Sequence, residues 1–398
     1  MERRGALRRI GAVVGIALVG VGATACVAPP NANVACAWPT RADASILNVA
    51  YPDAGATYWA TRYTLGPGQR LEFAGTFPEA RYLSFITYNV GGSAVDTLTD
   101  RDIAPDAGSD NPFVDPAADP DPENRRYTVT VDADAAVASG DNALAPAITT
   151  GGLVNGSVIL RVYVPDDASD PTGGVGLPSI TVRNPDGSAV PIAPCPTQAP
   201  DAGIVDLINL FGPATDQPPL DPPTFLRPAQ LGGLFANPDN AYVAAVIRHQ
   251  PGRVVVVRVP SPTFPDTRAG DPPSQPSQLR YWSLCSNEYR KPYPVSACVA
   301  DHEAVLDGAD VATFVVSTPA DRPTNATAAE GVTWLDWGST AVDGLLILRH
   351  MLPDPSFPES ALGVPPGSPA AATMGAYAPT ATTCTTAQFE AGGVGACP

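Results

Sequence analysis

The sequence predicts a mainly β, all-β-class protein built from two related antiparallel β-sandwich or jelly-roll-like domains with few short helices. Its 398 residues are too many for one compact core and suit two domains. Proline (46 residues) and glycine (36 residues) interrupt the chain often, yet 44% of the residues are apolar. Such a chain is rich in turns and still able to form a core. A set of motifs that occurs twice predicts that one β unit has been duplicated.

The repeated pattern runs from a Pro-Asp pair, through a tyrosine, to an Arg-Tyr-x-Ser segment. The copies span residues 51–89 and 237–287, and in each copy nine residues separate the tyrosine from a Pro-Gly turn. The same order with the same offset indicates a common strand plan. The residues that mark the two copies are Asp53, Tyr58, Arg81 and Tyr82 in the first, and Asp239, Tyr242, Arg280 and Tyr281 in the second.

A structural role is favoured for this repeat, because two domains with different ligands would have no reason to share it. Arg and Tyr are adjacent, so on a strand they point to opposite faces. We expect Arg81 to pair with Asp53, and Arg280 with Asp239, which would tie each Pro-Asp turn to a strand end.

Residues 1–25 have the pattern of a secretory signal peptide. Four arginines precede a short apolar stretch, residues 10–22, and small residues lead to Cys26. A cysteine at this place is typical of a bacterial lipobox, in which the Cys26 sulfur receives a diacylglycerol. Ordinary secretion, with Cys26 removed or left as a thiol, is the alternative. The predicted location is the extracytoplasmic face of the cell membrane, lipid-anchored through a tether of residues 26–44, or else outside the cell.

The other six cysteines predict three disulfide bonds, as in many exported proteins. Two pairs lie thirteen residues apart and would clip local loops, while the third would join the ends of the first domain. Zinc is the competing use, but no Cys-x-x-Cys motif occurs. The predicted pairs are Cys36–Cys195, Cys285–Cys298 and Cys384–Cys397.

The first β domain is predicted over residues 45–195. Residues 45–51 should start its first strand, and residues 58–64 and 70–76 should form a hairpin. The Asp- and Pro-rich segment 97–124 is too polar for a strand. Further strands are expected at 82–88, 127–131, 157–164 and 180–182.

Residues 196–236 are predicted as a linker with one short helix at 204–211, and residues 237–370 as the second β domain. Segment 341–351 fits either a helix or a strand, and a short helix is favoured. Residues 371–398 are expected to be a loose tail held by its disulfide. Strands of the second domain are expected at 242–249, 253–259, 281–286 and 311–317.

The net charge of −17 argues against a nucleic-acid partner, because neutralising phosphates requires a basic face. No catalytic signature is present: the chain lacks a Gly-x-Ser-x-Gly elbow and a phosphate-binding glycine loop. His249, His302 and His350 are interpreted as surface or strand-end residues. The tryptophans could line a sugar-binding face, but burial in the core is favoured. These are Trp59, Trp282, Trp334 and Trp337.

No cofactor is expected, and calcium is the open possibility. Carboxylates cluster beside Gly108, and calcium prefers oxygen ligands on such loops, although the EF-hand spacing is missing. The carboxylates concerned are Asp96, Asp100, Asp102, Asp106 and Asp110.

The order Asn237-Pro238-Asp239, then Tyr242, then Arg280-Tyr281-Trp282-Ser283-Leu284 resembles exported bacterial families of unknown function. The segment 77–85 looks like the same module, and the alanine- and proline-rich composition looks actinobacterial. The resemblance implies a β fold and no mechanism.

The predicted function is a non-enzymatic binding or scaffolding role in the cell envelope. The membrane would be a partner through the lipid anchor, and an envelope polymer, a small ligand or a partner protein would be the other. The alternative is an envelope hydrolase acting on carbohydrate or lipid through Asp and Glu residues in a cleft between the domains.

Overall fold

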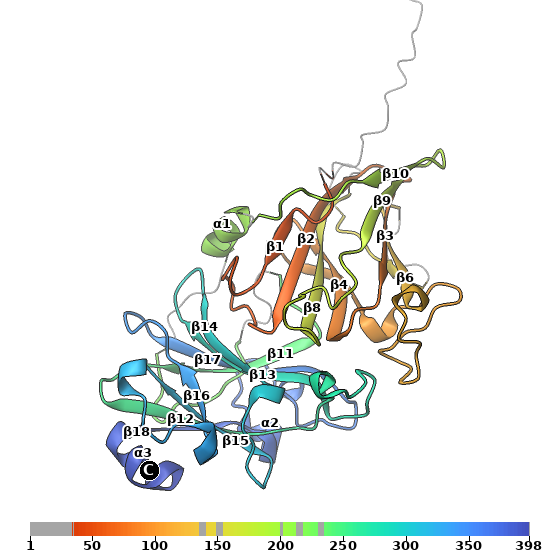
Figure 1. The fold of residues 1–398 in the computed structure, drawn as a ribbon. Helices are drawn as coiled ribbons and strands as arrows, with labels where there is room; N and C mark the ends of the chain where they lie inside the picture. Colours follow the sequence, from red (N-terminus) through yellow and green to blue (C-terminus); the bar gives the residue numbers. More distant parts are fainter. Residues whose placement is uncertain are drawn as a thin grey trace, which may run out of the picture.

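The computed structural model describes residues 34, 36–134, 141–148, 154–199, 202–211, 218–229 and 235–397. The predicted signal peptide and Cys26 lie outside these described residues. Within them the chain forms two β-sandwiches of two sheets each, which confirms the predicted fold class. In Figure 1 the first sandwich, red to yellow-green, lies above the second, green to blue.

The strands of the first domain are β1 (Thr40–Ala42), β2 (Ala56–Leu65), β3 (Arg70–Thr76), β4 (Ala80–Asn89), β5 (Ala94–Thr99), β6 (Arg126–Asp132), β7 (Ala143–Leu144), β8 (Val154–Pro165), β9 (Ser179–Arg183) and β10 (Ala189–Ile192). Those of the second are β11 (Asn240–Ile247), β12 (Arg253–Pro260), β13 (Leu279–Glu288), β14 (Val295–Ala300), β15 (Val311–Ser317), β16 (Thr333–Asp336), β17 (Gly344–Pro353) and β18 (Thr380–Thr385). The α-helices are α1 (Ala202–Phe211), α2 (Ala371–Met374) and α3 (Thr386–Gly392), and two short 3-10 helices used below are η1 (Asp100–Asp102) and η4 (Asp301–Glu303).

The two domains share one strand order. The sheets of the first are β1-β2-β8-β4-β5 and β10-β9-β3-β6-β7, and those of the second are β11-β17-β13-β14 and β16-β15-β12-β18. Without the additional edge strands β1 and β10, each sheet has its counterpart strand by strand. Both domains even contain the same parallel pair, β6 with β7 and β15 with β16, where a wholly antiparallel fold was expected.

The repeated residues occupy equivalent places in this common plan. In each domain the repeat tyrosine and the repeat serine lie on opposite sides of one arginine, on β8 or on β17. The two cross-strand rows are Tyr58–Arg161–Ser84 and Tyr242–Arg349–Ser283.

Each sandwich has its own apolar core, filled by the inward side chains of both sheets. Trp59, Trp282 and Trp337 are buried, as expected, and Trp334 is half-buried with the Arg322 guanidinium 4.4 Å from its ring centroid. The Val254–Val257 run lies in β12 between β15 and β18, so it is central as predicted.

The three predicted disulfide bonds are confirmed. Cys36 bonds Cys195 across 159 residues and thereby joins the two ends of the first domain, while the other two pairs are local. Disulfides persist in oxidising compartments, so they indicate an extracytoplasmic environment. In the described part of the chain, none of the helices is both long enough and apolar enough to cross a bilayer.

Several predicted elements are confirmed, among them the strands at 70–76 and 311–317 and the linker helix. The predicted hairpin of residues 58–64 and 70–76 is wrong, because β2 and β3 lie in different sheets and pair with other strands. Residues 45–51 form no strand. Instead β1 lies inside the predicted tether, and Trp38 before it is buried in the first core.

Two further expectations fail in the second domain. The favoured helix at 341–351 is wrong, because this segment forms β17, which pairs with both β11 and β13. The prediction of a loose tail is also wrong, because residues 371–398 contribute β18 to the β16-β15-β12-β18 sheet and α3 to a small apolar cluster. The predicted linker is also partly held, since Leu226 exchanges backbone hydrogen bonds with Ala244 on β11.

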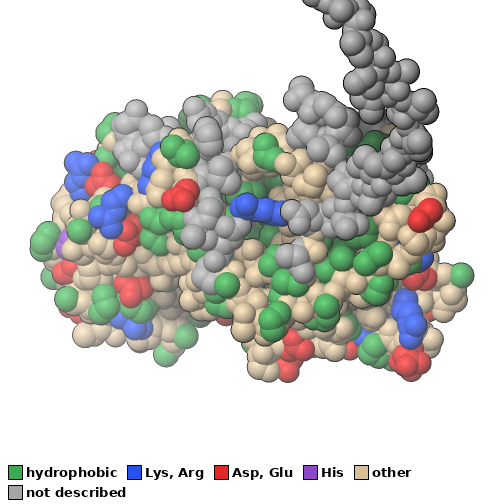
Figure 2. All heavy atoms as spheres, turned by 90° about the horizontal axis from the view of Figure 1, so that it is seen from above, with side chains coloured by type: hydrophobic (Ala, Val, Ile, Leu, Met, Phe, Trp, Pro, Cys, Tyr) green, Lys and Arg blue, Asp and Glu red, His purple; other side chains and the backbone are tan. Residues whose placement is uncertain are grey.

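Acidic and basic side chains lie close to one another in small mixed groups on the face shown in Figure 2, with hydrophobic side chains between the groups. The face therefore shows no broad patch of one charge.

Candidate functional site

A cavity of about 910 Å³ lies between the two domains. Its walls are the outer faces of the β1-β2-β8-β4-β5 sheet and of the β11-β17-β13-β14 sheet, whose inner faces form the cores. Pockets of this size are typical of small-molecule sites, which are mostly apolar and contain a few placed polar groups.

Strand periodicity explains how one segment serves both a core and the cavity. Side chains alternate between the two faces of a strand. On β8, Leu160 lies in the core, whereas Ile159 and Arg161 line the cavity. On β17, Leu348 lies in the core, and the cavity is lined by Ile347 and Arg349.

The tripeptide Ile-Leu-Arg therefore occurs at the same place in both domains. It is visible in the sequence at residues 159–161 and 347–349, downstream of the repeated motifs, but it was not recognised as part of the repeat. This signal could have identified the two arginines as equivalent positions of the repeat, although not as residues of a cavity.

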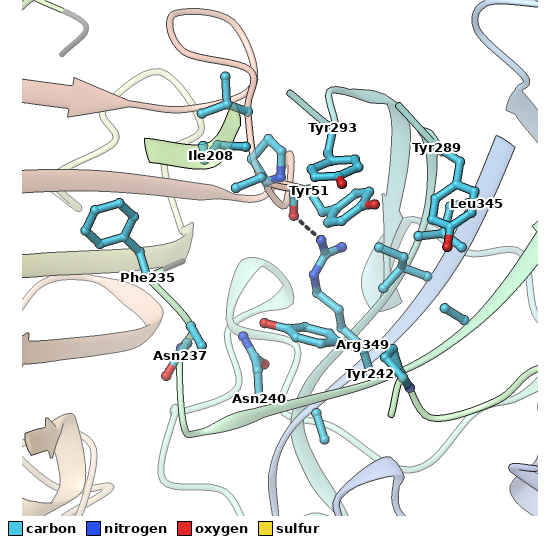
Figure 3. A pocket seen from close by; sticks show the side chains of 18 of the residues that line it. Tyr51, Ile208, Phe235, Asn237, Asn240, Tyr242, Tyr289, Tyr293, Leu345 and Arg349 are labelled. Carbon is cyan, nitrogen blue, oxygen red and sulfur yellow. Dashed lines mark hydrogen bonds between the residues drawn. The ribbon is translucent and has the colours of Figure 1, made fainter. Parts of the chain in front are cut away.

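Connecting segments complete the cavity. Ile204 and Ile208 of α1 line it, together with the segments before β2 and β11. Figure 3 shows aromatic rings around the space. Tyr51 and Phe235 come from the segments before β2 and β11, Tyr242 from β11, and Tyr289 and Tyr293 from the connection between β13 and β14. The rings of Tyr51 and Tyr293 stack with their centroids 4.6 Å apart.

Arg349 is held on every side by protein groups. One nitrogen donates to the carbonyl of Tyr51 (Figure 3). Nη1 lies 2.7 Å from Sγ of Cys285 and 3.6 Å from a carboxylate oxygen of Asp53. Its guanidinium also lies 5.5 Å from the ring centroid of Tyr242. These contacts balance its charge and fix its position.

Arg161 is buried to the same extent but has fewer partners. Its Nη2 donates to the carbonyl of Phe235 at 2.7 Å, and its guanidinium lies 5.5 Å and 5.4 Å from the ring centroids of Tyr58 and Tyr88. Its Nε and Nη1 have no hydrogen-bond partner, although only 2% of the residue is exposed. Within the described residues no carboxylate forms an ion pair with it.

The repeat arginines join the domains to each other instead of tying turns within a domain. Arg81 Nη1 donates to both carboxylate oxygens of Asp301, at 3.0 and 3.1 Å, so the predicted pairing of Arg81 with Asp53 is wrong. Arg280 Nη1 contacts Asp100 at 3.2 and 3.3 Å, so its predicted pairing with Asp239 is wrong as well. These two carboxylates open the equivalent helices η4 and η1, and each also accepts a backbone N–H from the neighbouring strand.

The tyrosines that follow the two repeat arginines also contact carboxylates of the other domain. Tyr82 donates to Asp239 at 2.7 Å and Tyr281 to Asp53 at 2.9 Å, so each Pro-Asp turn is held by the other domain. Burial, followed by the adjacent carboxylate, raises the pKa of both tyrosines well above its usual value. Both hydroxyls therefore stay protonated and act as donors.

The histidines and the acidic loop do not contribute to the cavity lining. His350 is fully buried on β17, which contradicts its interpretation as a surface or strand-end residue. Among the described residues the loop aspartates do not gather into a group of three possible metal ligands. A set of three possible ligand residues does occur at Asp53, Cys285 and Cys298, but both of these sulfurs belong to a disulfide.

Comparison with known proteins gives a fold and no activity. No family model matches the chain, and no curated protein matches it. A crystal structure of an uncharacterized protein from Burkholderia cenocepacia is similar over 88% of this chain and 82% of that one, at 14% identity and a TM-score of 0.50. The VPA0106 protein from Vibrio parahaemolyticus aligns over 82% of this chain and 89% of its own, at 10% identity and a TM-score of 0.41. At these identities the first likeness shows a shared fold, and the second carries no argument.

Proposed function

We propose that this protein is an exported binding protein whose interdomain cavity takes up a small, largely apolar molecule. The observation that carries the proposal is the cavity itself, about 910 Å³ of space walled by Ile, Leu, Val and Tyr side chains from both sandwiches. Apolar walls of this kind favour a ligand by removing its hydrocarbon surface from water. A scaffold without a ligand would have no need of such a space.

The hydrolase alternative finds less support in this geometry. The described lining of the cavity contains no Asp, Glu, His or Ser side chain. The four interdomain carboxylates already accept hydrogen bonds from Arg, Tyr, Ser or Thr donors. The described lining therefore gives a molecule in the cavity no pair of carboxylates that could act as acid and base.

Uptake of an apolar molecule is tested with N-phenyl-1-naphthylamine, a neutral dye that becomes fluorescent in apolar surroundings. The wild-type protein should bind the dye saturably. Ala244→Trp on β11 should reduce the binding at least tenfold, because it places an indole in the cavity. Ala74→Trp, which adds the same group on the exposed face of β3, is the matched control and should bind as the wild type does. Equal dye binding by the two variants would contradict the proposal.

The membrane anchor is a second part of the proposal, supported by the lipobox-like sequence at Cys26 and by the three disulfides. Lipidated protein should partition into the detergent phase of Triton X-114 and incorporate an alkyne-labelled fatty acid in cells. Cys26→Ser should abolish both. Label incorporation that persists in Cys26→Ser would place the lipid elsewhere.

A further inference from the structure

Arg161 is a buried cation with no counter-charge among the described residues that line the cavity. That lining contains three arginines, Arg161, Arg227 and Arg349, and no carboxylate. Arg349 lies 3.6 Å from Asp53, and Arg227 Nη1 donates to three backbone carbonyls of residues 361–364. Arg161 has neither arrangement.

The surroundings of Arg161 also keep it almost entirely out of contact with bulk water. Tyr58, Tyr88, Ile159 and Phe235 pack together around its end of the cavity, and 2% of the arginine is exposed. Burying a charge is costly unless the charge is paired, and an unmade hydrogen bond to a charged group adds to that cost. The flanking aromatic rings relieve only part of the cost.

Two nitrogens of the Arg161 guanidinium, Nε and Nη1, have no hydrogen-bond partner. The N–H groups of a guanidinium donate strong, charge-assisted hydrogen bonds to carboxylate and phosphate oxygens, so each of these nitrogens can donate to an oxygen of an anion.

We infer that the ligand of the cavity is an anionic amphiphile, whose carboxylate or phosphate head contacts Arg161 and whose hydrocarbon body lies along the apolar walls. This inference rests on the proposed function and adds the chemical class of its ligand. The domain duplication explains why one site arises: the equivalent arginine, Arg349, is already neutralised by Asp53 and the Tyr51 carbonyl.

The test is displacement of the neutral dye by three ligands with the same sixteen-carbon chain: palmitate, hexadecyl phosphate and hexadecanol. At least one of the two anions should displace the dye at a tenfold lower concentration than hexadecanol. The better of the two anions identifies a carboxylate or a phosphate as the head. Arg161→Gln should remove that advantage and leave displacement by hexadecanol unchanged, and Arg161→Lys should retain part of it.

Arg183→Gln is the matched control, because Arg183 is an exposed arginine on β9 whose loss changes net charge equally. It should behave as the wild type. Should Arg161→Gln fail to fold, the ligand series on wild-type protein still decides the question. If hexadecanol displaces the dye at the same concentration as both anions, the inference is overturned, but the proposed function still stands. A wild-type protein that binds neither the dye nor any of the three ligands overturns the proposed function itself.

Discussion

Arg81 and Asp301 form the most deeply buried ion pair between the domains, since the side chains of both are fully buried. A buried pair stabilises little compared with apolar packing, but removing one partner leaves an uncompensated charge. Their position across the domain boundary makes this cost a property of the whole assembly rather than of one sandwich.

We therefore expect Asp301→Asn to lower the free energy of unfolding by about 3 kcal/mol or more. The measurement is guanidinium-induced unfolding followed by fluorescence. Asp307→Asn is the matched control, because Asp307 is an exposed aspartate 3.6 Å from the exposed Arg258, and its effect on the free energy of unfolding should be much smaller. Similar losses in both variants would show that burial of the Arg81 pair has no such effect.

His350 predicts a dependence of stability on pH. It is fully buried on β17, its Nδ1 accepts the N–H of Ala361 at 3.3 Å, and burial lowers its pKa from 6.5 to about 3. Between these values the unfolded chain binds a proton that the folded chain does not, so stability should fall as pH drops below about 6.5.

From pH 6.5 to 5 this histidine should account for a loss of about 1 to 2 kcal/mol in the free energy of unfolding. His350→Asn keeps an acceptor near Nδ1 and does not titrate in this range. The variant should therefore show a shallower decline over the same pH interval, measured by urea unfolding at each pH. An unchanged slope would mean that His350 does not carry this dependence.

At the scale of elements, β18 shows how a segment that the sequence predicts as a tail can be part of a core. Its Thr-rich sequence lacks a clear apolar alternation, yet it pairs with β12 from Arg253 to Arg258 and carries the buried Cys384. The Cys384–Cys397 bond closes only a short loop behind the strand. The strand and the bond can be tested separately.

A chain that ends at residue 377 should fail to fold or should aggregate, because it exposes the edge of β12 and the apolar side chains that β18 and α3 cover. Replacing Cys384 and Cys397 together by Ala should leave a folded protein that is about 2 to 3 kcal/mol less stable. Near-ultraviolet circular dichroism and thermal unfolding distinguish the two results. If the truncated chain had native spectra, β18 would not be needed for folding.

The strands β8 and β17 show why a local pattern could not identify the cavity. Both are apolar on two faces, and a continuous apolar run of this length fits a buried strand or a buried helix equally well. Only the pairing of β17 with β11 and β13 decides that residues 341–351 form a strand. The same pairing places Arg349 opposite Tyr242, where it lines the cavity.

At the scale of the molecule, the two domains hold each other through an exchange of equivalent contacts. Arg81 and Tyr82 of the first domain contact Asp301 and Asp239 of the second, and Arg280 and Tyr281 reciprocate on Asp100 and Asp53. Six of the eight residues that mark the repeat, all except Tyr58 and Tyr242, thus also join the two domains.

We expect the two domains to unfold as one cooperative unit, with the calorimetric and van't Hoff enthalpies in agreement. The double variant Tyr82→Phe/Tyr281→Phe removes the interdomain hydrogen bonds of both hydroxyls, those of Tyr82 with Asp239 and Asn237 and that of Tyr281 with Asp53. It should lower the unfolding temperature and broaden or split the transition. Tyr63→Phe is the control, because the Tyr63 hydroxyl bonds Ala147 within one domain. It should lower stability without splitting the transition, and a wild-type protein with two separate transitions would contradict the expectation.

The sequence by itself determined the class of fold, the duplication, most strand positions and the three disulfides. These follow from local signals: turn residues, alternating apolar side chains, matched motif spacing and cysteine separation. The motif residues Asp53, Tyr58, Arg81 and Tyr82 were identified together with their counterparts, and a structural role was assigned to them, although their partners were assigned within each domain.

The tertiary structure decided which partners those residues have, where the cavity lies, and which of its arginines has a counter-charge. Arg81 lies 220 residues from Asp301 in the chain, and no local pattern encodes which distant carboxylate meets a buried guanidinium. The cavity likewise exists only where the outer faces of two sheets approach each other. Whether a buried arginine finds a counter-charge, as Arg349 does and Arg161 does not, depends on side chains that the fold brings together from both domains.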